Sequence, residues 1–186
     1  MPPELSIAGE VISDDSDCYV IAEVGHNHQG SLEGCKELFR QAKDCGASAV
    51  KLQKRNNREL YTSELYNRPY DNRNSYGASY GEHREALEFG LEEYTELKTY
   101  CEEIDITFFA TAFDFSSADF LEGLGVPAYK IASGDLKNTP LLEHVAQFGK
   151  PMIVSTGASV LEDVKRAYDT IMPINPQLCL MQCTAG

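Results

Sequence analysis

Short apolar runs rich in β-branched residues recur along the chain and alternate with segments of helical periodicity. In the first of those segments, Ser31 predicts an N-cap, apolar residues follow at three- and four-residue spacing, and Gly46 ends the helix. The same pattern predicts four more helices, at 91–103, 116–124, 140–148 and 159–171. The apolar runs predict six strands, at 18–23, 47–53, 106–111, 128–133, 152–156 and 178–184.

Strict alternation of strands and helices predicts a parallel sheet with right-handed crossovers. It fits an open doubly wound sheet or a (β/α)8 barrel, but the open sheet holds its ligand on a glycine-rich phosphate loop. Neither G-x-G-x-x-G nor G-x-x-x-x-G-K-[ST] occurs. We therefore expect the α/β, TIM-barrel type of fold with about six of its eight βα units, because a whole barrel takes ~250 residues. A small hairpin at 5–12 is expected to cap the bottom of the barrel.

Charge and cysteine usage narrow the class of protein. With 29 acidic against 16 basic residues, the net charge of -13 argues against a sequence-independent nucleic-acid binder, and any anion site must be built locally. No apolar run approaches the ~18–20 residues of a membrane span. The six cysteines are scattered without a Cys-x-x-Cys pair, which predicts reduced thiols in a cytoplasmic protein.

Polar side chains stand where most of the predicted strands end, which is where a barrel enzyme carries its active site. These residues are Glu23, Lys51, Gln53, Thr111, Lys130, Ser133 and Ser155. Burying a lysine inside an apolar strand is costly in free energy unless an anion pairs with its ammonium group. Lys51 and Lys130 beside hydroxyl groups therefore predict a pocket for phosphate or carboxylate. The alternative, in which each lysine pairs with a core acid such as Glu23, stays open.

Six segments of the chain resemble the N-acetylneuraminate (sialic acid) synthase family. Three come early: Ile21-Ala-Glu-Val-Gly-His-Asn-His-Gln-Gly30, Ala49-Val-Lys-Leu-Gln-Lys54 and Tyr80-Gly-Glu-His-Arg84. Three follow in order: Lys130-Ile-Ala-Ser-Gly-Asp-Leu-Lys-Asn-Thr-Pro140, Ser155-Thr-Gly157 and Gln182-Cys-Thr184. Residues 1–186 are accordingly expected to form a partial TIM-barrel synthase domain, without the family's last barrel strands and antifreeze-like domain.

The resemblance implies a metal-dependent transferase that condenses phosphoenolpyruvate with an N-acylmannosamine-type sugar to give a nonulosonic acid and phosphate. Glu23 would order the phosphoenolpyruvate pocket, and Asp135 would transfer a proton, unless it is only a helix-start carboxylate. Gln53 would contact the sugar, as would Asn74 unless it lies in a plain turn. The residues implied to hold phosphoenolpyruvate are Lys51, Thr111, Lys130, Ser133 and Ser155.

The family's divalent ion, Mn²⁺ or Mg²⁺, would have its ligands outside this chain, and His28 is expected to pack and order its loop. The complete enzyme is expected to be a homodimer, without nucleic-acid or membrane partners. Within the family the acceptor is free N-acetylmannosamine, its 6-phosphate or a bacterial diacetamido sugar, and the motifs fit each of them.

Three functional hypotheses follow. In the first, the chain is a synthase fragment that is inactive on its own. In the second, it is an incomplete barrel that acts as a binding or assembly module. In the third, it is another phosphoenolpyruvate-dependent synthase, or an aldolase in which Lys51 or Lys130 forms a Schiff base. Two lysines beside hydroxyl groups favour anion binding over imine chemistry.

Overall fold

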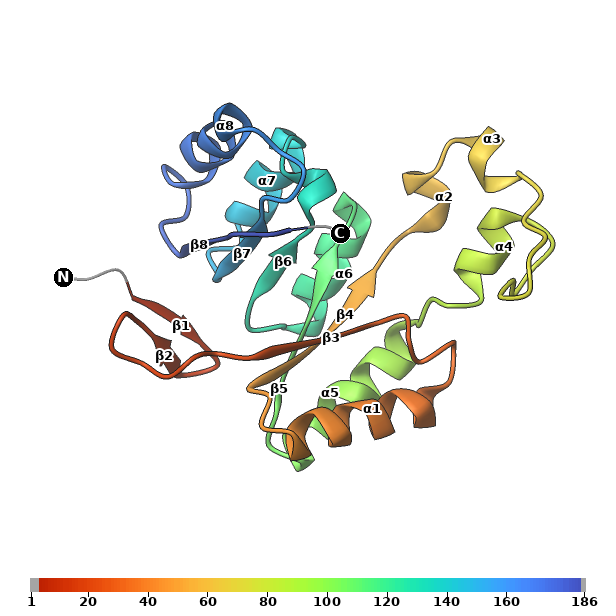
Figure 1. Ribbon diagram of the computed structural model, residues 1–186, viewed down its shortest axis with the longest axis horizontal. Helices are drawn as coiled ribbons and strands as arrows, with labels where there is room; N and C mark the ends of the chain where they lie inside the picture. The colour runs from red at the N-terminus through yellow and green to blue at the C-terminus, as the bar shows by residue number, and fades with distance from the viewer. Residues whose placement is uncertain (1–3, 185–186) are drawn as a thin grey trace.

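A computed structural model describes residues 4–184 and contains a six-stranded parallel sheet (Figure 1). The strands are β3 (Ile21–Gly25), β4 (Ala49–Lys54), β5 (Thr107–Ala112), β6 (Tyr129–Ile131), β7 (Met152–Ser155) and β8 (Leu178–Met181). Their order in the sheet is their order in the chain, and every neighbouring pair is parallel. This is the strand arrangement of a barrel wall rather than of a doubly wound sheet, in which the order reverses.

Five helices connect successive strands, as the periodicity predicted. They are α1 (Leu32–Asp44), α5 (Leu91–Glu103), α6 (Phe115–Leu124), α7 (Thr139–Ala146) and α8 (Leu161–Ile171). Ser31 caps α1, because its hydroxyl accepts a hydrogen bond from the amide of Gly34 at 3.0 Å. Gly46 follows the helix with φ +86°, a conformation that glycine adopts without strain. No helix among residues 4–184 is long and apolar enough to cross a bilayer.

The strand register sorts side chains between the two faces of the sheet, because paired residues in parallel strands point the same way. Glu23, Lys51 and Phe109 are paired in one row across β3, β4 and β5. Gln53, Thr111 and Lys130 are paired in the next row. The polar residues predicted at the strand ends therefore share one face, with Phe109 beside them.

The N-terminal hairpin is confirmed as β1 (Leu5–Ile7) paired with β2 (Glu10–Ile12). In four strands, boundaries predicted from the sequence were wrong by two or three residues. β3 spans Ile21–Gly25 rather than 18–23, and β8 ends at Met181 rather than at 184. β4 begins at Ala49 rather than at 47, and β6 ends at Ile131 rather than at 133. The apolar residues 18–20 precede β3, whereas the polar residues Gln182 and Thr184 follow β8, so residue type alone does not set the strand ends.

Three short helices lie in the segment between β4 and α5, where the sequence pattern predicts no helix. They are α2 (Asn57–Leu60), α3 (Ser63–Tyr66) and α4 (Tyr80–Glu85). At the start of α4, Ser79 and Glu82 form a capping box, each side chain bonding the backbone amide of the other. The Ser-x-x-Glu spacing was the available signal for this helix.

Candidate anion-binding active site

Lys51 is almost fully buried near the carboxyl end of β4, with 4% of its surface exposed. Its Nζ donates to Thr111 Oγ1 at 2.6 Å and forms an ion pair with Glu23. Burial lowers the pKa of Lys51, and the Glu23 carboxylate opposes that shift. The pairing of a strand lysine with Glu23, considered above as an alternative, is thus present. The Glu23 side chain is nevertheless 49% exposed, so its carboxylate faces solvent as well as the lysine.

Lys130, on β6, has no carboxylate partner among the described residues. Its Nζ donates to the carbonyl of Ile131 at 2.8 Å and to the hydroxyl of Ser155. Burial and the charge of Lys51 lower the pKa of Lys130 to about 8. These two partly dehydrated ammonium groups lie on one face with a single carboxylate, Glu23, which is paired with Lys51. An added anion would stabilise such a site.

Ser133 lies beside this pair, at the rim of a cavity of about 480 Å³ that Gly157 and Cys183 also line. Its hydroxyl accepts a hydrogen bond from the amide of Gly157 at 2.9 Å. A Cβ added at Gly157 would lie 2.9 Å from that oxygen, so this approach of backbone to side chain requires glycine. Ser133 is therefore held in a fixed position at the same end of the sheet.

The strand predicted at 178–184 includes both Cys179 and Cys183, but Cys183 lies outside it because β8 ends at Met181. A hydrogen bond with Ser155 lowers the pKa of the Cys183 thiol, and the charge of Lys130 adds to this effect. The spacing of the two cysteines gave no signal for this position, because it depends on where the strand ends.

Gln53 reaches the lysines through Glu23, and Asp135 follows Ser133 in the chain and lies near Arg55. Gln53 Nε2 donates to Glu23 Oε1 at 3.3 Å, and its Oε1 accepts from Arg55 at 2.7 Å. Asp135 ends a 3-10 helix, Ser133–Asp135, and the N-cap of α7 is Asn138, so Asp135 does not cap that helix. Burial raises the pKa of Asp135, while a hydrogen bond from Asn138 and the charge of Arg55 lower it.

Asn74 lies apart from these residues. It is exposed in a turn, and its amide donates to Asn72 Oδ1 at 2.9 Å. The structure therefore brings together eight of the nine predicted site residues at the carboxyl ends of the strands and leaves Asn74 outside that group.

The histidines of the loop that follows β3 contact other protein groups. His28 is buried, its ring stacks on Phe89 with centroids 4.2 Å apart, and Nδ1 accepts from the amide of Gly30. Burial lowers the pKa of His28 to about 4, which leaves the ring neutral near pH 7. Within residues 4–184, no three His, Cys, Asp or Glu side chains are grouped as metal ligands. The described residues thus do not by themselves form a site for the expected Mn²⁺ or Mg²⁺.

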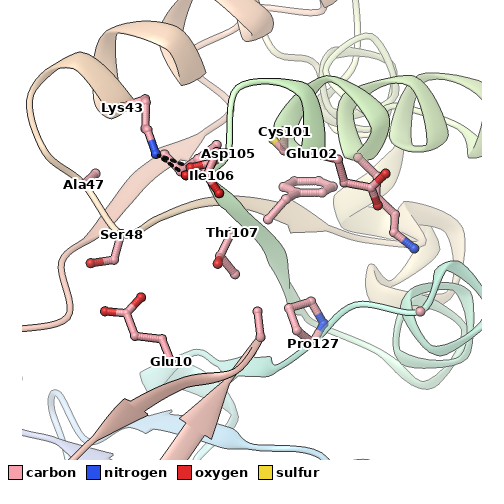
Figure 2. A pocket seen from close by; sticks show the side chains of 14 residues that line it. Glu10, Lys43, Ala47, Ser48, Cys101, Glu102, Asp105, Ile106, Thr107 and Pro127 are labelled. Carbon is pink, nitrogen blue, oxygen red and sulfur yellow. Dashed lines mark hydrogen bonds and ion pairs between the residues drawn. The ribbon is translucent and has the colours of Figure 1, made fainter.

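A second cavity, of about 730 Å³, lies at the opposite end of the sheet, between the β1–β2 hairpin and the N-terminal ends of β4 and β5 (Figure 2). Its two lysines already have partners, since Lys43 reaches Asp105 and Lys98 donates to the carbonyl of Leu124. The candidate site is therefore assigned to the carboxyl ends of the strands.

The low pKa of Lys130 predicts a pH-dependent anion affinity. Sulfate stays divalent between pH 7 and pH 10, so its binding reports the protein groups alone. Above pH 8, where Lys130 loses its proton, we expect sulfate affinity in calorimetry to fall by up to about tenfold per pH unit. Lys130→Arg keeps its charge over this range and should flatten the profile. An unchanged slope in that variant would assign the titration to another group.

Comparison with protein families places the chain among known proteins. The model of the NeuB family matches residues 38–186. The human N-acetylneuraminate-9-phosphate synthase is 40% identical over 187 residues, which cover 100% of this chain and 52% of the relative. The N,N'-diacetyllegionaminic acid synthase of Legionella pneumophila is 38% identical over 175 residues, covering 91% and 49%. The chain thus spans about half the length of the curated relatives it matches.

A solved structure has the same fold. The N-acetylneuraminic acid (sialic acid) synthetase of Leptospira borgpetersenii, crystallised with citrate, superposes with a TM-score of 0.85 at 28% identity. The match covers 100% of this chain and 61% of that one. Together with the strand order, this confirms the expected barrel-type α/β fold.

Proposed function

The chain belongs to the NeuB family, and from that premise we propose that it carries the phosphoenolpyruvate site of a sialic acid synthase-type transferase. The whole protein would condense phosphoenolpyruvate with an N-acylmannosamine-type sugar to give a nonulosonic acid and phosphate. One observation supports this proposal above all: the buried Lys51 and the half-buried Lys130 lie on one face of the sheet, each with a hydroxyl partner. Phosphoenolpyruvate carries two anionic groups, and Lys51 and Lys130 offer one ammonium group to each.

Each residue has a separate role in substrate binding. Lys51 with Thr111, and Lys130 with Ser155 and Ser133, bind the phosphate and carboxylate through charge-assisted hydrogen bonds. In the free protein the Glu23 carboxylate forms an ion pair with the Lys51 ammonium group. To bind Lys51, an anion must therefore either contact the ammonium group together with Glu23 or displace the carboxylate toward solvent. Gln53, which contacts Glu23, would then orient the sugar above phosphoenolpyruvate.

The reaction needs one proton at the aldehyde oxygen and one water. C3 of phosphoenolpyruvate attacks the aldehyde carbon of the open-chain sugar, and the carbonyl oxygen takes up a proton. We assign its delivery to Asp135, since burial raises the pKa of that carboxyl and so favours its protonated form. Water adds at C2 and loses one proton. The resulting C2 hydroxyl then gives its proton to the departing phosphate as the C2–O bond to phosphate breaks, which leaves the 2-keto acid and inorganic phosphate.

Urea unfolding tests the binding step. A ligand that binds only the folded chain stabilises it by ~2.7 kcal/mol at a concentration 100 times its Kd. We expect millimolar phosphoenolpyruvate to move the cooperative transition of the 186-residue chain to higher urea, whereas pyruvate, which lacks the phosphate, should have a smaller effect. Equal shifts with both compounds would contradict a site built for two anionic groups.

The depressed pKa of Lys130 also suits a Schiff-base aldolase, the alternative class. Borohydride treatment in the presence of pyruvate distinguishes the two chemistries, because reduction traps an imine as a stable adduct on the lysine. The proposed function requires that mass spectrometry find no adduct at Lys51 or Lys130.

A further inference from the structure

Arg55 and Arg84 differ from every other arginine of the chain in being withdrawn from solvent. Arg55 follows β4, and Arg84 lies on α4, so the fold brings them from separate segments. Both side chains are half-buried. The five remaining arginines are exposed: Arg40, Arg58, Arg68, Arg73 and Arg166.

Neither half-buried guanidinium has a carboxylate partner among the described residues, although the protein carries a net charge of -13. Arg55 donates Nη2 to the neutral amide of Gln53 at 2.7 Å and lies 3.7 Å over the ring of Phe113. Arg84 Nη2 lies 3.2 Å from His26 Nδ1. Arg55 Nη1 and Arg84 Nε are buried without a hydrogen-bond partner. A buried cation without a counter-charge is costly, so these two groups are suited to receive an anion.

Glu88, whose charge acts on Arg55, already has other partners. Glu88 lies 3.3 Å from His26 Nε2 through one oxygen and 3.4 Å from Lys54 Nζ through the other. The two guanidinium groups are close enough for the charge of Arg84 to add to burial in lowering the pKa of Arg55. They are therefore a cationic pair on which Glu88 acts from a distance but with which no described carboxylate forms a direct ion pair.

A continuous set of contacts connects this pair to the phosphoenolpyruvate pocket. Gln53 accepts from Arg55 and donates to Glu23, which is ion-paired with Lys51. Arg55 is also close enough to Asp135 to lower the pKa of that carboxyl. An acceptor sugar bound over Gln53, with its aldehyde toward Asp135, would thus have the two arginines within its surroundings.

We propose that Arg55 and Arg84 bind a phosphate ester of the acceptor, so that the substrate of this chain is a sugar phosphate rather than a neutral sugar. The proposal rests on the proposed function, because it concerns the second substrate of the same site. Guanidinium groups match phosphate through paired N–H donors, and two of them together can neutralise a dianion. A neutral acceptor, either free N-acetylmannosamine or a diacetamido sugar, would leave both guanidinium charges without a counter-charge.

Titration calorimetry with N-acetylmannosamine 6-phosphate and with N-acetylmannosamine, both at saturating phosphoenolpyruvate, tests the proposal. The wild-type chain is expected to bind the phosphate ester at least ~10-fold more tightly than the neutral sugar. Arg55→Gln and Arg84→Gln should each remove most of that difference and change the Kd of phosphoenolpyruvate less than about threefold. Arg73→Gln, which removes the same charge from an exposed position, is the matched control and should change neither Kd.

Arg84→Lys keeps the charge and should recover part of the affinity, and it allows the test to proceed if a glutamine variant does not fold. Equal binding of the two sugars by the wild-type chain would overturn the proposal while leaving the proposed function intact. So would glutamine variants that lose phosphoenolpyruvate but not the sugar phosphate, because the arginines would then serve the first substrate. Failure of phosphoenolpyruvate to bind the wild-type chain would instead overturn the proposed function and, with it, this assignment of the acceptor.

Discussion

Replacing Lys51 with methionine is expected to weaken phosphoenolpyruvate binding by at least ~100-fold, because each charge-assisted hydrogen bond of a buried group contributes about 1.5–3 kcal/mol. Methionine has a similar length and retains the packing in β4, where Lys51 is almost fully buried. Glu23 loses its ion-pair partner, but its carboxylate is half-exposed and remains hydrated. Calorimetry of Lys51→Met against the wild-type chain measures the loss.

The matched control is Lys165→Met, which removes the same charge from an exposed lysine paired with Asp169 on α8. Exposed pairs of this kind contribute under ~1 kcal/mol, so its phosphoenolpyruvate affinity should match that of the wild-type chain. Retained binding in Lys51→Met, with a normal urea transition, would show that the buried lysine belongs to the core and not to an anion site.

Phe109→Ala is expected to lower the free energy of unfolding by about 3–5 kcal/mol, the cost of removing a large buried aromatic side chain and leaving a cavity. Phe109 is fully buried on β5, and it is paired with Lys51 in the sheet, so its ring lies on the face that carries the candidate site. Because the loss approaches the whole stability of many domains, the urea midpoint should fall sharply.

Phe115→Ala provides the comparison, since Phe115 is 45% exposed at the start of α6. Truncation there should change the free energy of unfolding by less than about 1 kcal/mol. Similar losses in the two variants would mean that the face beside the candidate site does not form a packed core in solution.

The sequence was sufficient to predict the helices and strands that have a regular hydrophobic period, and to predict which side chains those elements carry. Ser31 and Gly46 mark both ends of α1 through local chemistry alone, and Lys51 and Thr111 meet because parallel strands bring their carboxyl ends to one edge. The helices α2 and α3 are four residues each, which is too short for a hydrophobic period to develop.

Contacts between segments far apart in the chain could not be predicted in the same way. The approach of Arg84 to His26 joins residues 58 positions apart and depends on how the segment between β4 and α5 folds back. No local pattern reports whether a given arginine finds a carboxylate, since that is settled by tertiary packing. The position of Cys183 likewise depends on the end of β8.

Because the strands lie in the sheet in the order in which they occur in the chain, every strand finds its partner in the adjacent βα unit. The sheet can therefore grow one unit at a time, and no strand must wait for a distant segment before it pairs. Such a topology keeps the entropy cost of loop closure low at each step, a property that favours folding from the N-terminus as a chain is synthesised.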